Sequence, residues 1–298
     1  MAQAAYAIPT EREINVASVP HRSPFRYPGG KTWLVPYIRL WLRHNPRRYR
    51  ELIEPFAGGA IVGVSAAFER LVDKVTLIEL DPDVASVWAT ILGRDGEKLA
   101  ARILAFEPTL KSVMPLLEAE PKSTLERAFA TIIRNRVQRG GILAPGAGLM
   151  NKGENGRGLA SRWYPETLYR RIMDLISIKH KIHFLNADGV DYIRRNRHRK
   201  SVAFFVDPPY TVAGRRLYKF SEMDHKGLFE LLGKADGGFL MTYDDSSEIR
   251  HLVVQSRFDC ETVAMKNTHN ACMTELLVGK KLDWLRIPKS PQLPLRGF

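Results

Sequence analysis

Cysteine and long apolar runs are both scarce in this chain. The 298 residues include two cysteines, which excludes a disulfide-stapled scaffold and a zinc site built from clustered Cys and His. No stretch approaches the roughly 20 apolar residues that span a bilayer, so no membrane association is expected. The first residues also lack the apolar segment of a secretion signal, since Glu11, Arg12 and Glu13 interrupt them. We therefore expect a cytoplasmic protein.

Acidic residues are outnumbered by basic ones. The chain has 45 Lys and Arg against 32 Asp and Glu, a formal net charge of +13 and a pI near 9.8. Residues 121–200 contain 17 Lys and Arg against 6 Asp and Glu, an excess of 11 positive charges. Such a concentration is typical of contacts with nucleic-acid phosphates. Each small cluster taken alone is equally consistent with a solvated face or a helix C-terminus.

The most informative pattern that is present is Asp207-Pro208-Pro209-Tyr210, directly after the apolar run 202–206. The run predicts a buried strand, which brings a carboxylate, two rigid prolines and an aromatic ring to its end. A base whose exocyclic NH2 donates to Asp207 and to the Pro208 carbonyl would have a localised nitrogen lone pair, while Tyr210 stacks on the ring. The pattern predicts methylation of such an amine; the alternative is an ordinary strand end with an Asp-Pro turn.

A second pattern is typical of a nucleotide-binding corner. A strand at residues 49–53 leads into the turn Glu54-Pro55-Phe56-Ala57-Gly58-Gly59-Ala60, and a helix is predicted at residues 61–71. The following strand, residues 74–80, ends in Glu79 and Asp81. These acids lie about 20 residues past the glycines, where an acidic side chain commonly binds ribose hydroxyls.

Strands and helices alternate along the rest of the chain. A stretch with seven glycines at residues 140–158 predicts a long loop. The alternation predicts an α/β fold with a mostly parallel sheet and an antiparallel edge hairpin. Helices are predicted at residues 82–92, 124–138, from Glu166 onward, 190–196, 224–233 and 246–255, and strands at residues 182–186, 202–206, 238–243, 258–265 and 274–279.

A possible phosphate-binding loop near the N-terminus is rejected. Gly30-Lys31-Thr32 matches the end of that motif, but Phe25 stands where the motif needs glycine. Pro24 and Pro28 also disfavour the strand that should lead into it. The segment is predicted instead to line one side of a cofactor pocket.

In their order along the chain, these motifs resemble those of DNA adenine methylases. The motifs are Tyr27-Pro28-Gly29-Gly30-Lys31, the Glu54 to Gly59 turn, Ile78-Glu79-Leu80-Asp81 and Asp207-Pro208-Pro209-Tyr210. The chain resembles a Dam-type N6-adenine DNA methyltransferase over about residues 24–280. The resemblance implies a Rossmann-like, S-adenosylmethionine-dependent methyltransferase sheet with an inserted target-recognition region. The implied units are a catalytic domain at 24–120 and 181–285, the DNA target-recognition insertion at 121–180, and flexible tails at 1–23 and 286–298.

The resemblance also implies roles for individual residues and no metal. Tyr27 stands where a tryptophan is frequent in the family, and Glu79 where an aspartate is more usual. Trp163 and Tyr164 are predicted to stack on bases or wedge into a duplex, or equally to pack at a helix start. The implied catalytic residues are Asp207, Pro208, Pro209 and Tyr210; those that bind S-adenosylmethionine are Tyr27, Gly30, Lys31, Glu54, Phe56, Gly58, Gly59, Glu79, Asp188 and Asp207; those that bind DNA are Arg134, Arg136, Arg139, Lys152, Arg157, Arg162 and Trp163.

The expected mechanism is direct methyl transfer to a flipped base. Duplex DNA with a short specific target would be bound, an adenine would rotate out of the stack, and N6 would attack the sulfonium methyl in line. The resemblance implies a prokaryotic or phage-type, nucleoid-associated protein and admits a cognate restriction endonuclease as a partner. Two alternatives stay open: methylation of cytosine N4 or of an RNA base, and a DNA-binding regulator that kept the fold without catalysis. Asp207 before Pro-Pro-Tyr favours adenine by resemblance, and the presence of Lys31 argues against the regulator.

Overall fold

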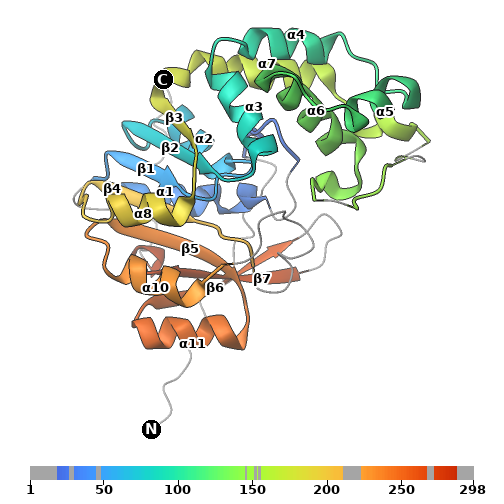
Figure 1. Cartoon of the computed structure of the whole chain (residues 1–298). Coiled ribbons are helices and arrows are strands. Elements are labelled where there is room, and N and C mark those ends of the chain that lie inside the picture. The colour runs from blue at the N-terminus through green and yellow to red at the C-terminus, as the bar shows by residue number, and fades with distance from the viewer. Residues whose placement is uncertain are drawn as a thin grey trace, which may run out of the picture.

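A seven-stranded sheet forms the centre of the protein (Figure 1). The computed structural model describes residues 19–26, 30–44, 48–144, 146–150, 153, 156–210, 223–266 and 272–286. The strands are β1 (Glu51–Glu54), β2 (Lys74–Glu79), β3 (Ile182–Asn186), β4 (Val202–Val206), β5 (Gly238–Asp244), β6 (Asp259–Lys266) and β7 (Cys272–Gly279), in the order β3-β2-β1-β4-β5-β7-β6. The pairs among β1 to β5 are parallel, while β7 runs antiparallel to β5 and β6. The predicted mostly parallel sheet with an antiparallel edge hairpin is confirmed.

Helices cover both faces of the sheet because successive strand residues point to opposite sides. In β4, Phe205 joins the core cluster that includes α1 (Val35–His44) and α2 (Ile61–Phe68). Its neighbour Phe204 joins the opposite cluster, with α8 (Gly189–Asn196), α10 (His225–Gly233) and α11 (Ser247–Ser256). Burial on both faces explains why β4 reads as one continuous apolar run.

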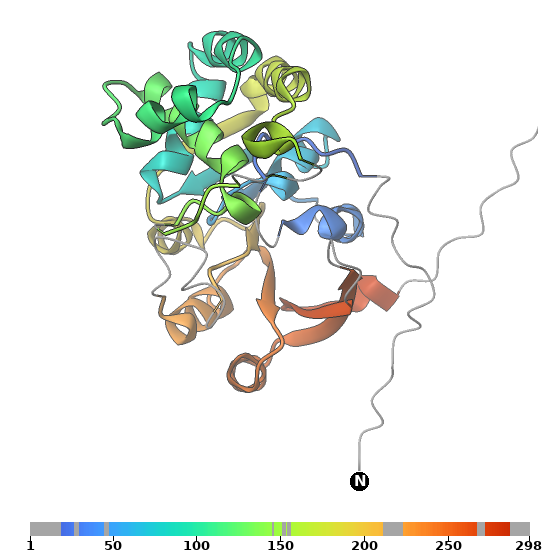
Figure 2. The same ribbon diagram turned by 90° about the vertical axis from the view of Figure 1, so that its right-hand side faces the viewer.

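A group of helices lies at the other end of the molecule from α10 and α11 (Figure 1), and Figure 2 shows the group far from the β6–β7 hairpin. The group contains α3 (Pro82–Leu92), α4 (Gly96–Leu104), α5 (Leu110–Glu118), α6 (Thr124–Val137) and α7 (Pro165–Ser177). Because α4 and α5 precede residue 121, the helical group is larger than the predicted insertion. No helix in the described ranges is both long and apolar enough to cross a membrane.

Short 3-10 turns complete the fold. One of them, η2 (Lys31–Leu34), leads into α1 and carries Lys31. The others are η3 (Arg139–Gly141), η4 (Gly158–Arg162), η5 (Lys179–Lys181) and η6 (Asp283–Arg286). Leu149 in the predicted glycine-rich loop forms an isolated antiparallel bridge with Gln138, which precedes the loop.

The described chain begins in contact with the core. Val19 is 1% exposed, although residues 1–23 were predicted as a tail. Arg171 Nη1 in α7 donates to the Ser23 carbonyl at 3.2 Å. Residues 23–26 therefore pack against the helical group. Residues 1–18 and 287–298 lie outside the described part of the chain.

Candidate active site

The predicted acidic residues meet where parallel strands end. Strands β1 and β4 are neighbours in the sheet, although β2 and β3 separate them in the sequence. The chain reverses its direction of strand addition between them, which is where α/β sheets bind ligands. Glu54 ends β1, Glu79 ends the adjacent β2, and Asp207 directly follows β4. The topology therefore brings three carboxylates to one edge of the sheet.

Asp207 has one carboxylate oxygen saturated by protein donors. Its Oδ1 accepts from Thr242 Oγ1 at 2.7 Å and Tyr210 Oη at 3.1 Å, and Lys31 Nζ lies 3.1 Å away. Its Oδ2 makes no hydrogen bond or ion pair with any residue that the structure describes, and 23% of the side chain is exposed. A carboxylate held by one oxygen is fixed in orientation, so the other oxygen can accept from a substrate.

Lys31 and Glu275 complete this cluster, and sequence reasoning missed Glu275. Lys31 Nζ lies 3.5 Å from Glu275 Oε2, and both side chains are 6% exposed or less. Burial raises the pKa of Glu275 to about 7, the Lys31 ammonium acts to lower it, and the Asp207 carboxylate raises it. The available signal was a lone acid before the apolar run 276–278 in a predicted strand.

Tyr210 uses its hydroxyl as well as its ring. The hydroxyl lies 3.1 Å from both Asp207 Oδ1 and Glu275 Oε2. Burial, followed by the charges of these two carboxylates, raises the pKa of Tyr210 well above its usual value. Its ring stacks on Tyr243 with centroids 6.0 Å apart. The predicted stacking of Tyr210 on a base stays a prediction, and the structure adds a polar role.

The two prolines between these residues are packed against the core. Pro208 is buried and Pro209 is half-buried. Since neither has a backbone N–H, neither competes for the carbonyls that would receive a base amine. They hold the main chain between Asp207 and Tyr210 in a restricted conformation.

The glycine turn after β1 is fixed by hydrogen bonds to its backbone. Gly58 has a positive φ of 45°, which glycine adopts readily, and Ala60 has a φ of 47°. Gly58 N donates to Glu79 Oε2 at 2.7 Å, and Trp88 Nε1 donates to the Gly58 carbonyl at 2.8 Å. The turn is thereby tied to the acidic end of β2, as a nucleotide-binding corner requires.

Glu54 and Glu79 are buried carboxylates with an unusually high affinity for protons. Glu54 accepts from Gly63 N at 2.8 Å, and Glu79 also accepts from Asp81 N at 2.8 Å. Burial raises the pKa of Glu54 well above its usual range, and the charges of Asp207 and Glu79 add to this. Burial also raises the pKa of Glu79, to about 7. Two buried carboxylates beside the glycine turn favour a positively charged ligand.

The remaining predicted cofactor residues lie around this corner. Gly30 precedes η2 and is exposed, while Phe56 and Gly59 are half-buried within the turn. Asp188 is exposed, and its side chain caps α8 by accepting from Asp191 N at 2.8 Å. Tyr27 lies outside the described residues. No group of His, Cys, Asp and Glu able to hold a metal ion is found in the ranges that the structure describes.

Two residues predicted to contact DNA are buried instead. Arg136 is 4% exposed, and its Nη2 donates to the Pro24 carbonyl at 2.6 Å. Burial and then the charges of Arg171, Arg26 and Arg162 lower its pKa. Trp163 donates from Nε1 to the Phe106 carbonyl at 2.9 Å and is buried, so it packs as a helix-start residue rather than as a wedge. Neither side chain is exposed for the predicted contact with DNA, because helix spacing alone does not show which face is covered, and for Trp163 the alternative of packing at a helix start fits.

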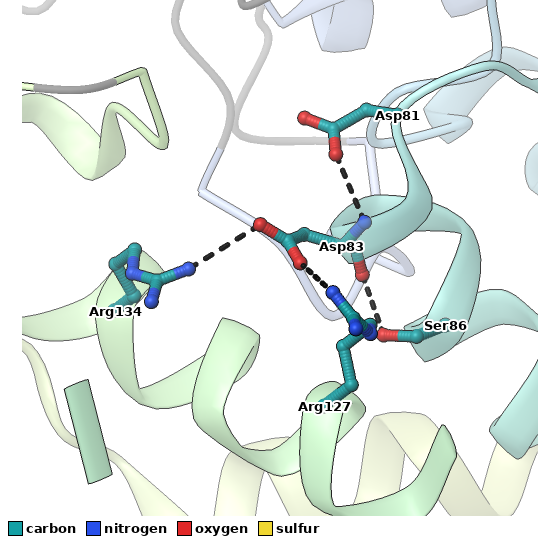
Figure 3. A network of polar contacts seen from close by, with 5 residues as sticks. All are labelled: Asp81, Asp83, Ser86, Arg127 and Arg134. Carbon is teal, nitrogen blue, oxygen red and sulfur yellow. Dashed lines mark hydrogen bonds and ion pairs between the residues drawn. The ribbon is translucent and has the colours of Figure 1, made fainter. Parts of the chain in front are cut away.

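Arg134 is engaged in an interhelical ion pair (Figure 3). Its Nη1 lies 3.4 Å from Asp83 Oδ2, and Arg127 Nη1 lies 3.1 Å from Asp83 Oδ1. Asp83 is in the first turn of α3. These pairs join α6 to the helix that follows the acidic end of β2.

The other predicted DNA residues remain near the surface. Arg139 and Arg157 are exposed and Arg162 is half-buried, whereas Lys152 lies outside the described residues. Asn135 Oδ1, in the neighbouring α6, accepts from Arg26 N at 2.9 Å. Burial lowers the pKa of Arg26 and the nearby charge of Arg162 lowers it further, so this part of the basic segment lies near residues 19–26.

One family model and several solved structures are similar to this chain. Two structures of the rRNA methyltransferase aviRa from Streptomyces viridochromogenes align with the chain at TM-scores of 0.41 and 0.42, each with 15% identity. The alignments cover 95% and 93% of this chain and 99% and 97% of the other. Among curated proteins no significant match is found. Residues 27–112, which carry Lys31, the glycine turn and Glu79, match the model of the D12 class N6 adenine-specific DNA methyltransferase family, and this confirms the resemblance that the motifs predicted.

Proposed function

We propose that the protein transfers a methyl group from S-adenosylmethionine to N6 of an adenine in duplex DNA, after the base has rotated out of the stack. The observation that carries the proposal is the state of Asp207. Its Oδ1 is occupied by Lys31, Thr242 and Tyr210, and its Oδ2 is open at the end of β4. This is the arrangement that an amine donor requires, and it stands beside the segment that matches the adenine methyltransferase family.

The buried acids fit a sulfonium cofactor. S-adenosylmethionine carries a sulfonium and an ammonium, and burial raises the pKa values of the Glu54 and Glu79 carboxylates, so a cation bound beside them would favour their ionised forms. Glu79, anchored by Gly58 N and Asp81 N, keeps lone pairs for ribose hydroxyls. Lys31, Glu54 and Glu79 would hold the group. When bound, it supplies an electrophilic methyl group.

The chain's own residues would orient and polarise the amine. Asp207 Oδ2 and the Pro208 carbonyl accept its two N–H bonds, which localises the nitrogen lone pair. The N–C bond forms as the C–S bond breaks, and the bonding pair stays on sulfur. Positive charge grows on N6 during this step, so a hydrogen bond to Asp207 is stronger in the transition state than in the ground state. The methylated nitrogen then loses a proton, which restores a neutral amine.

The exposed arginines support a polyanionic substrate. Arg139 and Arg157 are exposed on the segment with an excess of 11 positive charges. The ion pairs of Arg127 and Arg134 with Asp83 connect that segment to α3. Phosphate contacts would therefore be made by a unit that is fixed to the catalytic sheet.

Methyl transfer to defined duplexes tests the proposal. Purified protein should transfer labelled methyl from S-adenosylmethionine to duplex DNA, and mapping of the modified base should find N6-methyladenine in a fixed sequence context. Label on cytosine N4 or on RNA would support the alternative methyltransferases. DNA binding without transfer would support the regulator.

A matched pair of aspartate variants gives the control. Asp207→Ala should abolish transfer, because it removes the acceptor for the amine. Asp236→Ala should keep it, because Asp236 is exposed before the start of β5, at the opposite end of that strand from Thr242 and Asp244. Full transfer by Asp207→Ala would exclude the proposed site.

A further inference from the structure

Glu275 is a buried acid that no sequence motif assigns. It lies in β7, paired in register with Asp244 on β5 and with Val263 on β6. Its side chain is 6% exposed, and its Oε2 lies close to Lys31 and Tyr210. Burying a carboxylate is costly unless it is paired, so an acid in the middle of an apolar strand needs a specific reason.

Glu275 and Asp207 compete for the same two donors. Lys31 Nζ lies 3.1 Å from Asp207 Oδ1 and 3.5 Å from Glu275 Oε2. The Tyr210 hydroxyl lies 3.1 Å from both oxygens, yet it has one proton and can donate to one carboxylate at a time. When Lys31 or Tyr210 interacts with Glu275, its interaction with Asp207 is therefore weaker.

We propose that Glu275 is a positioning residue for methyl transfer. In its ionised form it shares the Lys31 ammonium and the Tyr210 hydroxyl, and so leaves Asp207 a stronger acceptor for the substrate amine. The inference rests on the proposed function, since it concerns how Asp207 receives that amine. Glu275 itself acts through Lys31 and Tyr210 and forms no bond to the substrate.

The surroundings of Glu275 place its ionisation in the working range of an enzyme. Burial raises the pKa of Glu275 to about 7 against the lowering effect of Lys31. The other ionisable groups that face it are Asp207 and Tyr210 after β4 and its cross-strand partner Asp244 on β5, whose pKa burial also raises. Its partner on β6 is the apolar Val263.

Protonation of Glu275 would change the direction of its hydrogen bonding. A protonated Glu275 can donate to Tyr210 Oη instead of accepting from it, so the Tyr210 proton turns to Asp207. Lys31 is then no longer shared between two carboxylates of this cluster, and its ammonium interacts with the ionised Asp207 alone among them. Asp207 becomes a weaker acceptor, and the transfer rate should fall as pH falls through about 7.

Glu275→Gln tests the inference because glutamine keeps the shape of the side chain but cannot ionise. The wild-type kcat should rise by up to about 10-fold between pH 6 and pH 8, since the ionised fraction of a group with pKa about 7 changes by that factor and the plateau rate of the protonated form reduces the rise. The variant should have no such step. At every pH its kcat should stay near the low-pH plateau of the wild type, with KM for DNA changed less than about 3-fold.

Glu230→Gln is the matched control, because Glu230 is exposed on α10. It should keep the wild-type rate and pH step. If Glu275→Gln does not fold, as judged by circular dichroism, Glu275→Asp decides the question. That variant retains an ionisable carboxylate and should keep a pH step, and loss of the step would overturn the inference.

The outcomes separate the two proposals. An active wild type whose rate and pH step survive in Glu275→Gln overturns the role of Glu275 and leaves the proposed function standing. A wild type that transfers no methyl group to DNA at any pH overturns the proposed function, and the role of Glu275 falls with it.

Discussion

Replacing Asp207 with asparagine tests which part of this side chain supports methyl transfer. The asparagine oxygen can still accept from Lys31, Thr242 and Tyr210, which now bond to Asp207 Oδ1. The amide NH2 then stands where Oδ2 was, and it presents a donor to the substrate's own donor. The variant therefore removes the acceptor and the negative charge but keeps the framework around them.

The size of the effect follows from these contacts. One charge-assisted hydrogen bond that strengthens in the transition state is lost, which costs about 3 to 4 kcal/mol, or roughly a 100- to 1000-fold fall in kcat. The ground-state hydrogen bond contributes about 1 kcal/mol, so KM for DNA should rise less than 10-fold. Folding should be affected modestly, because the buried Lys31 keeps Glu275 as an ionised partner at 3.5 Å.

Single-turnover transfer of labelled methyl to a duplex substrate measures the chemical step directly. Equilibrium binding of S-adenosylmethionine and thermal unfolding should be measured on the same preparations, so that a loss of rate is not confused with a loss of structure. A rate within 3-fold of the wild type would refute the role assigned to Oδ2.

Three further predictions concern the charged side chains. Binding of S-adenosylmethionine should release protons and tighten as pH rises through about 7, because Glu79, whose pKa burial raises to about 7, ionises beside a cation. Titration calorimetry in two buffers of different ionisation enthalpy measures this, and equal heats would contradict it. Without cofactor, the free energy of unfolding should fall as pH rises from about 5 to 8, by at most about 3 kcal/mol per carboxyl. The folded pKa values of Glu79 and Glu275, near 7, lie above the ordinary 4.5, so the folded state binds extra protons at low pH and loses them over this range. Urea unfolding that is flat across this range would count against the prediction. Arg157→Ala should reduce the slope of DNA affinity against salt concentration, on logarithmic scales, by about one phosphate contact. Arg136→Met should leave that slope unchanged, because Arg136 is buried against the Pro24 carbonyl. Fluorescence anisotropy at several salt concentrations distinguishes the two.

Several elements could be predicted from local pattern and others could not. The predicted bounds 82–92, 182–186 and 202–206 are those of α3, β3 and β4, because buried strands and a helix with an Asp cap carry strong local signals. Helices α1, α4 and α5 were not predicted. Helix α5 has nine residues with Pro115 inside it and one buried side chain, Val113. Short helices of this kind depend on tertiary contacts rather than on propensity.

The sequence predicted part of the chemistry of the site but not its geometry. Asp207, Tyr210, Lys31 and Glu79 stand in short motifs whose residue types indicate their use. Glu275 stands in no motif. It reaches Lys31 because β7 inserts antiparallel beside β5, which itself pairs with β4.

The sequence alone determined that a carboxylate, two prolines and a tyrosine end a buried strand, and that a glycine turn precedes an acidic strand end. These are consequences of neighbouring residues. The tertiary structure decided which donors saturate Asp207 Oδ1 and that Arg136 and Trp163 turn inward. Those outcomes depend on strand order and helix packing, which bring together residues far apart in the chain, and no local pattern contains that information.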